Sequence, residues 1–359
     1  MTPAPRNVLV VVTRRIGDVL LATPVIHSLK CAWPEARIDV LVFEGTQGVI
    51  AAGPDINCIL TIPERPGTAQ HLAFMARLFR RYDLALSLVP GDRPTLYAFL
   101  AGRRRAGLLV PTRKEKWKRC LLDHWVPYQA ATKHTLLTHL SILAPLGVTA
   151  LPEVSVKWHN NDAQRVDLLL KPLDDARFIV LHLYPKFNYK KWNAHGWIAL
   201  ASWLTANKLR IVLTGSGDAA ELEYVRELAR GMNNPLNLAG QLSLSESACV
   251  IARAAAYVGP DTALTHMAAA LGVKTIALLG PTNPLTWGPW PKTHTALSNP
   301  WHALGDQSCG NVLLLQGSAA CVPCSNEGCD RHVASYSDCL VNLPPTRVIN
   351  ALQKSLKLQ

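Results

Sequence analysis

Apolar runs alternate with helical patterns through the first half of the chain. Residues 7–12, NVLVVV, form a continuous β-branched run, which is typical of a strand buried on both faces of a parallel sheet. Further strand-like runs cover residues 37–43, 58–62 and 83–89, and helical patterns cover residues 18–33, 68–80 and 132–146. This alternation predicts a doubly wound α/β domain over residues 1–160.

The alternation weakens and then restarts in the second half. Pro152, Pro172 and the pair Asn160-Asn161 interrupt it between residues 151 and 173, where we place a linker. A second α/β domain is expected over residues 175–340, followed by an amphipathic helix at 345–359. Its strands are expected at residues 177–183, 209–214, 256–259 and 274–279, and its helices at 194–206, 218–231, 243–252 and 262–271. The predicted architecture is two Rossmann-like, doubly wound parallel-sheet domains with a cleft between them.

Composition and charge narrow the class of protein. A hydrophobic content of 49% with 17% charged residues is typical of a compact globular protein. The run 7–12 is far too short to span a bilayer and has no secretory features, so we expect a cytoplasmic protein. The net charge of +12 favours phosphates, acidic sugars or an anionic leaflet as partners. Nucleic acid is not expected, because the chain has no RNP, helix-turn-helix or zinc-finger pattern.

The loop Arg14-Arg15-Ile16-Gly17-Asp18 directly follows the first predicted strand. Ligands of open α/β sheets bind at the carboxyl ends of the strands, so this loop is expected to face the cleft. Asp18 is either the N-terminal cap of the next helix or a general base that takes a proton from an acceptor hydroxyl. The motif G-x-G-x-x-G is absent after this strand, which argues against a dinucleotide site.

Two loops of the second domain carry candidate ligand groups. Residues 184–192, YPKFNYKKW, place Lys190 and Lys191 after a predicted strand, where they either hold a diphosphate or form a solvated charge pair. Residues 214–218, TGSGD, form a glycine-rich turn after the next strand. Such a turn lets the backbone approach a ligand closely, although it also occurs for packing alone.

Residues 259–266, GPDTALTH, give the strongest signal for a site. A strand is expected to end at Gly259 and a helix to begin near Thr262. The free N–H groups and positive end of that helix suit a departing diphosphate, and they can stabilise its charge in place of a bound Mg²⁺. In the alternative, Asp261 and Thr262 are only helix caps and His266 is a packed helix residue.

The chain is similar, over nearly its whole length, to the lipopolysaccharide heptosyltransferases of glycosyltransferase family 9. The resemblance implies the GT-B fold, an ADP-heptose donor, and an inverting single displacement onto a hydroxyl of the lipopolysaccharide inner core, with no cofactor required. The segments that carry the resemblance, in the order found in that family, are RRIGDVLLATPVIHSLK (14–30), KKW (190–192), LTGSGDAAE (213–221), LAGQLSL (238–244), GPDTALTHMAAALGVKTIALLGPTNP (259–284) and WGPW (287–290).

The resemblance also implies roles for single residues. Asp18 would be the general base. Lys190 would contact the donor phosphates, since its spacing to Trp192 matches the family's K-x-W, and Lys191 is the alternative.

The remaining donor contacts would come from the second domain. Asp261 would bind the heptose hydroxyls, and Glu221, or else Glu223, the ribose. The diphosphate would lie beside His266 and accept hydrogen bonds from the backbone of Thr262, Ala263 and Leu264. Many family members have glycine where this chain has Ala263, and the extra methyl group limits how closely a phosphate approaches.

Basic residues gather in the N-terminal half, at Arg103-Arg104-Arg105 and in residues 113–119, RKEKWKR. They form either an ordinary solvated surface or a site for a phosphorylated, acidic lipid acceptor at the inner-membrane surface, where Trp117 would rest. We therefore expect peripheral association with the inner membrane. The residues expected to bind the acceptor are Arg14, Arg15, Arg105, Lys116 and Arg119.

Four of the nine cysteines lie close together in the segment 309–339. Cys321, Cys324, Cys329 and Cys339 have the spacing C-x2-C-x4-C-x9-C, whose later intervals match no standard zinc finger. They form either a structural zinc or iron site or a set of thiols without metal. Similar cysteine-rich tails occur in some relatives, including iron-bearing heptosyltransferases that modify autotransporter adhesins.

Two other functions remain open at this point. One is a heptosyltransferase whose acceptor is a protein such as an autotransporter adhesin. The other is a non-catalytic nucleotide-sugar-binding protein of the same fold. Asp18 speaks against the second, because a pure binder has no use for a base at the acceptor edge.

Overall fold

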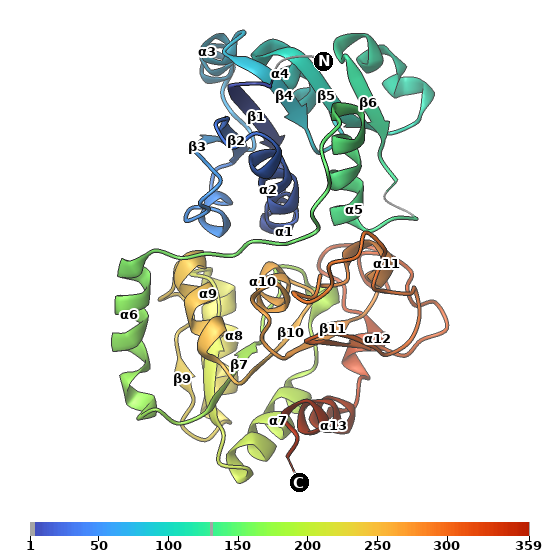
Figure 1. Cartoon of the computed structure of the whole chain (residues 1–359). Coiled ribbons are helices and arrows are strands. Elements are labelled where there is room, and N and C mark those ends of the chain that lie inside the picture. The colour runs from blue at the N-terminus through green and yellow to red at the C-terminus, as the bar shows by residue number, and fades with distance from the viewer. Residues whose placement is uncertain (1–3, 130–131, 359) are drawn as a thin grey trace. The chain divides into compact units, whose positions relative to one another are not determined.

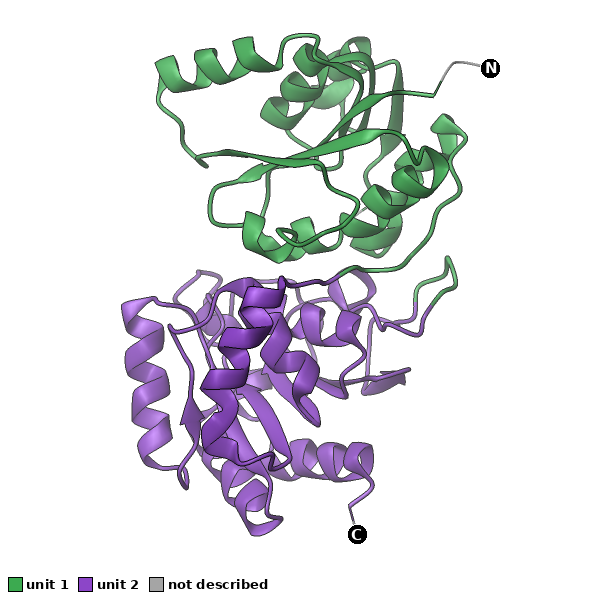
Figure 2. Cartoon of the chain, turned by 60° about the vertical axis from the view of Figure 1, so that its left-hand side comes forward, with its two compact units in different colours: residues 1–155, 295–299 green, residues 156–294, 300–359 purple. Residues whose placement is uncertain are grey.

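The computed structural model describes residues 4–129 and 132–358, which divide into two compact units (Figure 2). Unit 1 comprises residues 1–155 and 295–299, and unit 2 comprises residues 156–294 and 300–359. The main chain therefore passes from one unit to the other at Ser155–Val156, near the start of the expected linker.

Unit 1 is built around a six-stranded parallel sheet with the order β3-β2-β1-β4-β5-β6 (Figure 1). This order reverses direction between β1 and β4, as in a Rossmann fold. Residues 8–12 are fully buried, because β1 lies in the centre of the sheet. The strands are β1 (Asn7–Val12), β2 (Arg37–Phe43), β3 (Cys58–Ile62), β4 (Tyr82–Ser87), β5 (Gly102–Leu109) and β6 (His124–Pro127).

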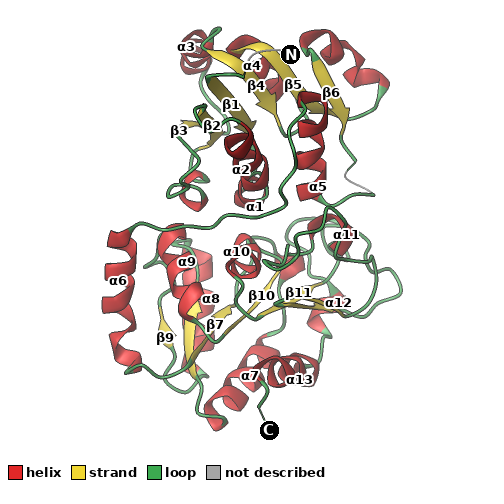
Figure 3. Ribbon diagram, in the orientation of Figure 1, coloured by secondary structure: helices red, strands yellow, loops and turns green. Residues whose placement is uncertain are grey.

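Helices cover both faces of this sheet (Figure 3). The helix predicted over residues 18–33 is divided in two, because Pro24 lies in the first turn of α2 and fixes a new helix start after Ala22. The helices are α1 (Ile16–Leu20), α2 (Thr23–Ala32), α3 (Thr68–Leu78), α4 (Asp92–Ala101) and α5 (Thr135–Leu140), with 3₁₀ turns η1 (Gln47–Val49), η2 (Arg113–Leu121) and η3 (Ser141–Leu146).

Unit 2 repeats this topology with one additional strand. Its sheet has the order β12-β13-β11-β10-β7-β8-β9, and only the edge pair β12–β13 is antiparallel. The order reverses between β7 and β10, so the predicted doubly wound sheets are confirmed in both units. The strands are β7 (Phe178–His182), β8 (Arg210–Thr214), β9 (Leu236–Asn237), β10 (Ala256–Pro260), β11 (Thr275–Leu279), β12 (Gln307–Cys309) and β13 (Val312–Gln316).

The segment expected to be a linker contains a helix, α6. Asn160 and Asn161 begin this helix instead of breaking the pattern, and His159 and Asp162 form a capping box at its start. Arg165 of α6 pairs with Glu246 of α9 at 2.6 Å. The helices of unit 2 are α6 (Asn160–Leu170), α7 (Ala194–Ala206), α8 (Ala219–Arg230), α9 (Leu244–Arg253), α10 (Ala263–Leu271), α11 (Pro284–Trp287), α12 (Asp338–Val341) and α13 (Pro345–Leu356), with 3₁₀ turns η4 (Lys171–Leu173) and η5 (Asn188–Lys190).

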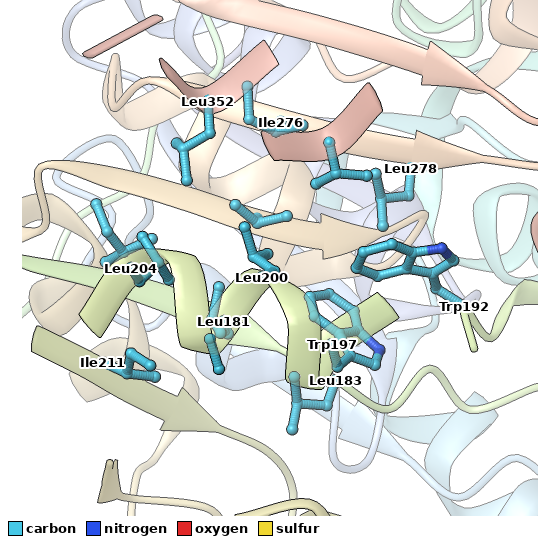
Figure 4. Close-up of a cluster of buried hydrophobic side chains, with 14 of the residues drawn as sticks. Leu181, Leu183, Trp192, Trp197, Leu200, Leu204, Ile211, Ile276, Leu278 and Leu352 are labelled. Carbon is cyan, nitrogen blue, oxygen red and sulfur yellow. The ribbon is translucent and has the colours of Figure 1, made fainter. Parts of the chain in front are cut away.

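Trp192 anchors the loop between β7 and α7 in the hydrophobic core of unit 2 (Figure 4). Its ring packs edge-on against Trp197 with centroids 4.8 Å apart, and its indole N–H donates to the Leu343 carbonyl at 2.8 Å. Gly196 is needed beneath it, since a Cβ there would lie 2.3 Å from the Trp192 ring. The two lysines that precede Trp192 are therefore held at a fixed position beside the sheet.

Among the described residues, none of the helices has the length and apolar character required to span a bilayer.

Candidate functional site

The switch point of the unit 2 sheet brings two predicted segments together. β7 and β10 are neighbours in the sheet, and their connections leave its carboxyl edge in opposite directions. Lys190 lies in η5 after β7, and Asp261 directly follows β10. The Lys190 Nζ lies 2.5 Å from Asp261 Oδ2, so a contact joins residues that are 71 positions apart.

Asp261 is the centre of a buried polar cluster. Its Oδ2 also accepts a hydrogen bond from the Thr282 hydroxyl at 2.8 Å, and its Oδ1 lies 3.6 Å from His266 Nε2. Burial alone would raise the pKa of Asp261, but the charge of Lys190 and the contacts with His266 outweigh it and lower the pKa well below its ordinary value. Asp261 is therefore ionised at any pH at which the protein works.

The start of α10 offers free backbone donors beside this carboxylate. Thr262 is the N-cap residue but its side chain makes no capping hydrogen bond. Its hydroxyl instead lies 3.4 Å from that of Thr265, which donates to the Pro260 carbonyl. The first N–H groups of α10, at Ala263 and Leu264, are therefore not satisfied by a side-chain cap and suit an anion.

His266 has one ring nitrogen without a partner within the described chain. Its Nε2 faces Asp261, whereas its Nδ1 is buried and makes no hydrogen bond. A buried polar atom of this kind costs free energy unless a ligand or water satisfies it. An anionic ligand at the uncapped start of α10 would be close to this unpaired Nδ1.

Lys191 lies in a separate pocket formed by aromatic rings. Its Nζ is 3.8 Å from the ring centroid of Tyr184, 5.1 Å from that of Tyr224 and 6.0 Å from that of Tyr336. Burial lowers the pKa of Lys191, and Glu221 partly opposes this shift. The resemblance assigned Lys190 to the donor phosphates with Lys191 as the alternative, and the structure places only Lys190 against Asp261.

Glu221 folds back under the glycine-rich turn that follows β8. The Ser216 hydroxyl donates to Glu221 Oε2, while Oε1 is buried without a partner within the described residues. A Cβ at Gly215 would lie 2.7 Å from this Oε1, so a side chain at this position would displace the Glu221 carboxylate. Asp218 caps α8 by accepting from the backbone N–H groups of Ala220 and Glu221. Glu223 forms an ion pair with Arg226 and is half exposed, which favours Glu221 of the two predicted candidates.

In unit 1, Asp18 lies at the corresponding carboxyl edge. It is the third residue of α1, whose N-cap is Arg15, so the interpretation of Asp18 as the helix cap is wrong. Its side chain is only 8% exposed. Burial raises the pKa of Asp18, although Arg14 and Arg15 partly counteract this shift. A buried carboxylate with a raised pKa is typical of a general base.

Two further polar groups near Asp18 were not predicted. Tyr128 follows β6, and its pKa is raised by burial and by the Asp18 charge. The hydroxyl of Thr13, at the end of β1, is buried with no hydrogen-bond partner in the described chain. Neither residue belongs to a motif: Tyr128 lies outside the candidate segments, and Thr13 immediately precedes the motif of residues 14–18.

The predicted acceptor residues are spread over unit 1. Arg14 and Arg15 are exposed beside Asp18. Arg105 lies in the middle of β5 and not at its carboxyl edge. It is level in the sheet with Ala85 of β4, which is in turn level with Leu9 of β1. Lys116 is exposed on η2, and the Arg119 guanidinium stacks 4.1 Å from the Trp125 ring. The structure therefore brings Arg14 and Arg15 to Asp18 but does not bring Arg105 there.

The cysteine cluster shows no metal-binding geometry. Cys321, Cys324, Cys329 and Cys339 are free thiols, and within residues 4–129 and 132–358 no three His, Cys, Asp or Glu side chains are arranged to hold a metal ion. Burial raises the pKa of Cys339 to about 11, and the other three thiols add to this shift. The structural zinc or iron site thus stays one of the two alternatives that the sequence leaves open.

Comparison with known proteins identifies the family. A model of glycosyltransferase family 9 (heptosyltransferase) matches residues 74–314, which is more than half of the chain. The chain belongs to glycosyltransferase family 9. It is 30% identical over 289 residues to lipopolysaccharide heptosyltransferase 3 of Escherichia coli, and the alignment covers 76% of this chain and 83% of that protein.

Solved structures of family 9 proteins have the same fold. The glycosyltransferase family 9 protein of Veillonella parvula superposes with a TM-score of 0.79 at 18% identity, covering 99% of this chain and 98% of that one. The E. coli ADP-heptose lps heptosyltransferase II superposes with a TM-score of 0.74 at 20% identity, covering 98% of both chains. The predicted GT-B fold and the predicted family are therefore confirmed, and the chain is a glycosyltransferase of the heptosyltransferase family.

Proposed function

We propose that this family 9 glycosyltransferase transfers heptose from ADP-heptose to a hydroxyl of the lipopolysaccharide inner core, with inversion at the anomeric carbon. The observation that carries the proposal is the buried cluster of Asp261, Lys190 and His266 at the uncapped start of α10. The names of the similar E. coli proteins, which specify lipopolysaccharide and ADP-heptose, support the choice of substrates.

Unit 2 would bind the donor. The diphosphate would accept hydrogen bonds from the backbone of Thr262, Ala263 and Leu264, with His266 Nδ1 as a further contact. Asp261 would accept hydrogen bonds from the heptose hydroxyls, and Lys190, which pairs with it, would face both sugar and phosphate.

Glu221 and Lys191 would serve the nucleoside end of the donor. The unpaired Glu221 Oε1 would accept hydrogen bonds from the ribose hydroxyls, which would satisfy a buried atom that has no partner within the described chain. The tyrosine pocket would keep Lys191 away from the phosphates. The positive charge of Lys191 would offset the negative charge of Glu221.

Unit 1 would supply the base. The acceptor hydroxyl oxygen attacks the anomeric carbon, Asp18 takes its proton, and the bond from that carbon to the ADP oxygen breaks, so that ADP leaves with the electron pair. A single displacement of this kind inverts the configuration. Lys190, His266 and the positive end of α10 would stabilise the charge that develops on ADP, so no metal ion is needed for this step.

The acceptor would be bound at a membrane surface. Arg14, Arg15, Lys116 and Arg119 are candidate contacts for its phosphate and carboxylate groups, and we place the reaction at the cytoplasmic face of the inner membrane. Arg105 is the weakest of the predicted contacts because of its position within β5.

Isothermal titration with ADP and with UDP tests the donor assignment. We expect ADP to bind and UDP to bind at least tenfold more weakly; a preference for UDP would overturn the assignment. Labelling of deacylated core oligosaccharide, compared with an autotransporter adhesin fragment, tests the acceptor. Transfer to the adhesin alone would replace the saccharide acceptor by a protein, and binding without transfer to either would leave only a nucleotide-binding function.

A further inference from the structure

Helix α3 exposes apolar side chains on its outer face. Leu72 is 59% exposed and Phe79, the residue that ends the helix, is 60% exposed. They are seven positions apart, with exposed Ala76 between them, so they lie on one stripe of the helix. The opposite stripe is already used, because Leu78 is buried and Phe74 and Met75 pack against the core of unit 1.

Arginines border this stripe, and the nearest acidic residues in the sequence, Glu64 and Asp83, lie before and after it. Residues 65–82 contain Arg65, Arg77, Arg80 and Arg81 but no aspartate or glutamate. Within the described part of the chain, none of these four side chains forms an ion pair, and all four are exposed. The Arg80 guanidinium lies 5.9 Å from the Phe79 ring, so charge and apolar surface are adjacent. We call Leu72, Ala76, Phe79, Arg77, Arg80 and Arg81 the α3 face.

We infer that the α3 face docks unit 1 on the surface of an anionic lipid bilayer. Apolar side chains flanked by arginines fit such an interface, since Leu and Phe enter the boundary between headgroups and acyl chains while the guanidinium groups meet anionic headgroups. The inference rests on the proposed function in one respect, namely that the acceptor is carried on a lipid.

The charge of the α3 face distinguishes a bilayer from other occupants. A second copy of the chain, paired face to face, would place Arg77, Arg80 and Arg81 against the same residues of its partner and would be repelled. A protein partner would need an acidic patch in register with these arginines. The headgroups of an anionic leaflet need no such register, because lipids diffuse to the charges that they neutralise.

Figure 3 shows α3 beside α4 at the surface of unit 1, and the two helices are in contact. Residues 79–81 lead into the amino end of β4, whereas Asp18 follows the carboxyl end of the parallel neighbour β1, so this part of the α3 face lies at the opposite edge of the sheet from Asp18. The α3 face belongs to the same unit as the proposed base, so docking through it would bring the acceptor-binding unit to the surface that carries the acceptor.

Vesicle flotation tests the inference directly. The full chain is mixed with vesicles of phosphatidylglycerol and phosphatidylcholine, or of phosphatidylcholine alone, at low salt. We expect binding to the anionic vesicles, and at least tenfold weaker binding to the neutral ones or at high salt.

The double variant Leu72→Ser with Phe79→Ser should bind to the anionic vesicles about tenfold more weakly than the unmodified protein. The matched control is Leu168→Ser, a leucine that is 61% exposed on α6 of unit 2, which should bind as the unmodified protein does.

A charge series gives a second, independent readout. Arg77→Gln with Arg80→Gln should weaken binding to anionic vesicles at least tenfold and reduce its dependence on salt. The control is Arg226→Gln, an exposed arginine of α8 that should have no effect. Circular dichroism checks that each variant is folded.

Binding that is equal for the α3 variants and their controls, or no binding of the unmodified protein to anionic vesicles, would overturn the inference. Loss of a dimer in the α3 variants, seen by sedimentation without vesicles, would assign the face to a second copy instead.

The docking and the transfer reaction can fail separately. Turnover on a deacylated, soluble core acceptor should be unchanged in the α3 variants, because no member of the α3 face belongs to the proposed site. Vesicle binding without any transfer would contradict the proposed reaction but still support the α3 face as the docking surface.

Discussion

Asp18 and Asp261 are both buried aspartates, but their neighbours shift their pKa values in opposite directions. Burial dominates at Asp18 and raises its pKa, whereas Lys190 and His266 overcome burial at Asp261 and lower it. Environments that separate two carboxyl groups in this way commonly mark different roles. Here a carboxylate that can take up a proton lies in unit 1, and one that stays ionised lies in unit 2.

The pH dependence of turnover should report Asp18. Only the ionised carboxylate can accept a proton, so kcat/KM should fall as the pH drops through a pKa above the ordinary value of 3.8. Asp261 should not contribute to this acid limb, because its pKa is lowered and it stays ionised throughout. A pH profile on a soluble acceptor measures the limb. A profile that stays flat down to the pH at which the protein unfolds would contradict the role of Asp18.

Removing Lys190 should destabilise the fold through Asp261. In Lys190→Met the buried carboxylate keeps Thr282 and His266 but loses the Lys190 cation, and we expect a loss of about 3 kcal/mol in the free energy of unfolding at neutral pH. The double variant with Asp261→Asn should recover much of that loss, because no buried charge is left unpaired. Urea unfolding of the two variants measures the difference. If the double variant is less stable than Lys190→Met alone, the pair is not coupled as described.

At the scale of elements, the segment that holds the four cysteines contacts the loops after β7 and β11. The Asn188 side-chain amide in η5 donates to the Ala334 carbonyl at 3.0 Å, and Tyr336 closes the pocket of Lys191. The backbone N–H of Ser325 donates to the Pro281 carbonyl at 2.8 Å, one residue before Thr282. This segment therefore positions the loops after β7 and β11.

The turn between β8 and α8 offers a substitution with a matched control. A methyl group at Gly215 would lie 2.7 Å from Glu221 Oε1 and displace the carboxylate, whereas the space around Gly217 is open within 4 Å. We expect Gly215→Ala to weaken ADP binding about tenfold, which corresponds to one hydrogen bond to a charged group. Gly217→Ala should bind ADP normally. Calorimetric titration compares them, and equal affinities would remove Glu221 from the nucleotide site.

Strands with plain apolar runs were predictable from the sequence, and the basic strand was not. β1 and β7 were predictable because apolar residues, many of them β-branched, fill both faces of a buried strand. β2 and the edge strand β3 were predictable from their short apolar runs. β5 begins with Gly102 followed by three arginines, so its pattern indicated a charged surface cluster. Helix α6 was hidden because its Asn-Asn start is equally typical of a loop.

Site residues within motifs were predictable, and their partners were not. Asp261, Lys190 and Glu221 lie at strand ends, where the topology of an α/β sheet collects ligand groups. Thr282 and Tyr336 reach the site only through tertiary packing, so no local pattern reveals them. The K-x-W spacing favoured Lys190 over Lys191, but the aromatic pocket that holds Lys191 apart from Asp261 is visible only in the structure.

For the whole molecule, charge is distributed unevenly between the units. Unit 1 holds 19 of the 37 lysines and arginines but only 11 of the 25 acidic residues, counted over residues 1–155 and 295–299. These 19 basic and 11 acidic residues give unit 1, which carries Asp18 and the α3 face, a formal charge of +8 of the chain's +12, and unit 2 has +4. This asymmetry fits an acidic acceptor and an anionic surface.

Turnover should not require a divalent cation. Lys190, His266 and the start of α10 would provide the positive charge that many glycosyltransferases take from a metal ion. We therefore expect the rate to be the same within twofold in EDTA and in added Mg²⁺. A rate that falls at least tenfold in EDTA and is restored by Mg²⁺ would mean that these residues do not suffice.

The most direct measurement is transfer to deacylated inner-core oligosaccharide by the unmodified protein and by Asp18→Asn, followed by mass spectrometry and by NMR of the new anomeric centre. The account predicts addition of one heptose from ADP-heptose with inverted configuration, release of one ADP per product, and a loss of ~10²-fold or more in rate for Asp18→Asn with ADP affinity unchanged. Product with retained configuration, or an Asp18→Asn variant that works at the normal rate, would contradict it.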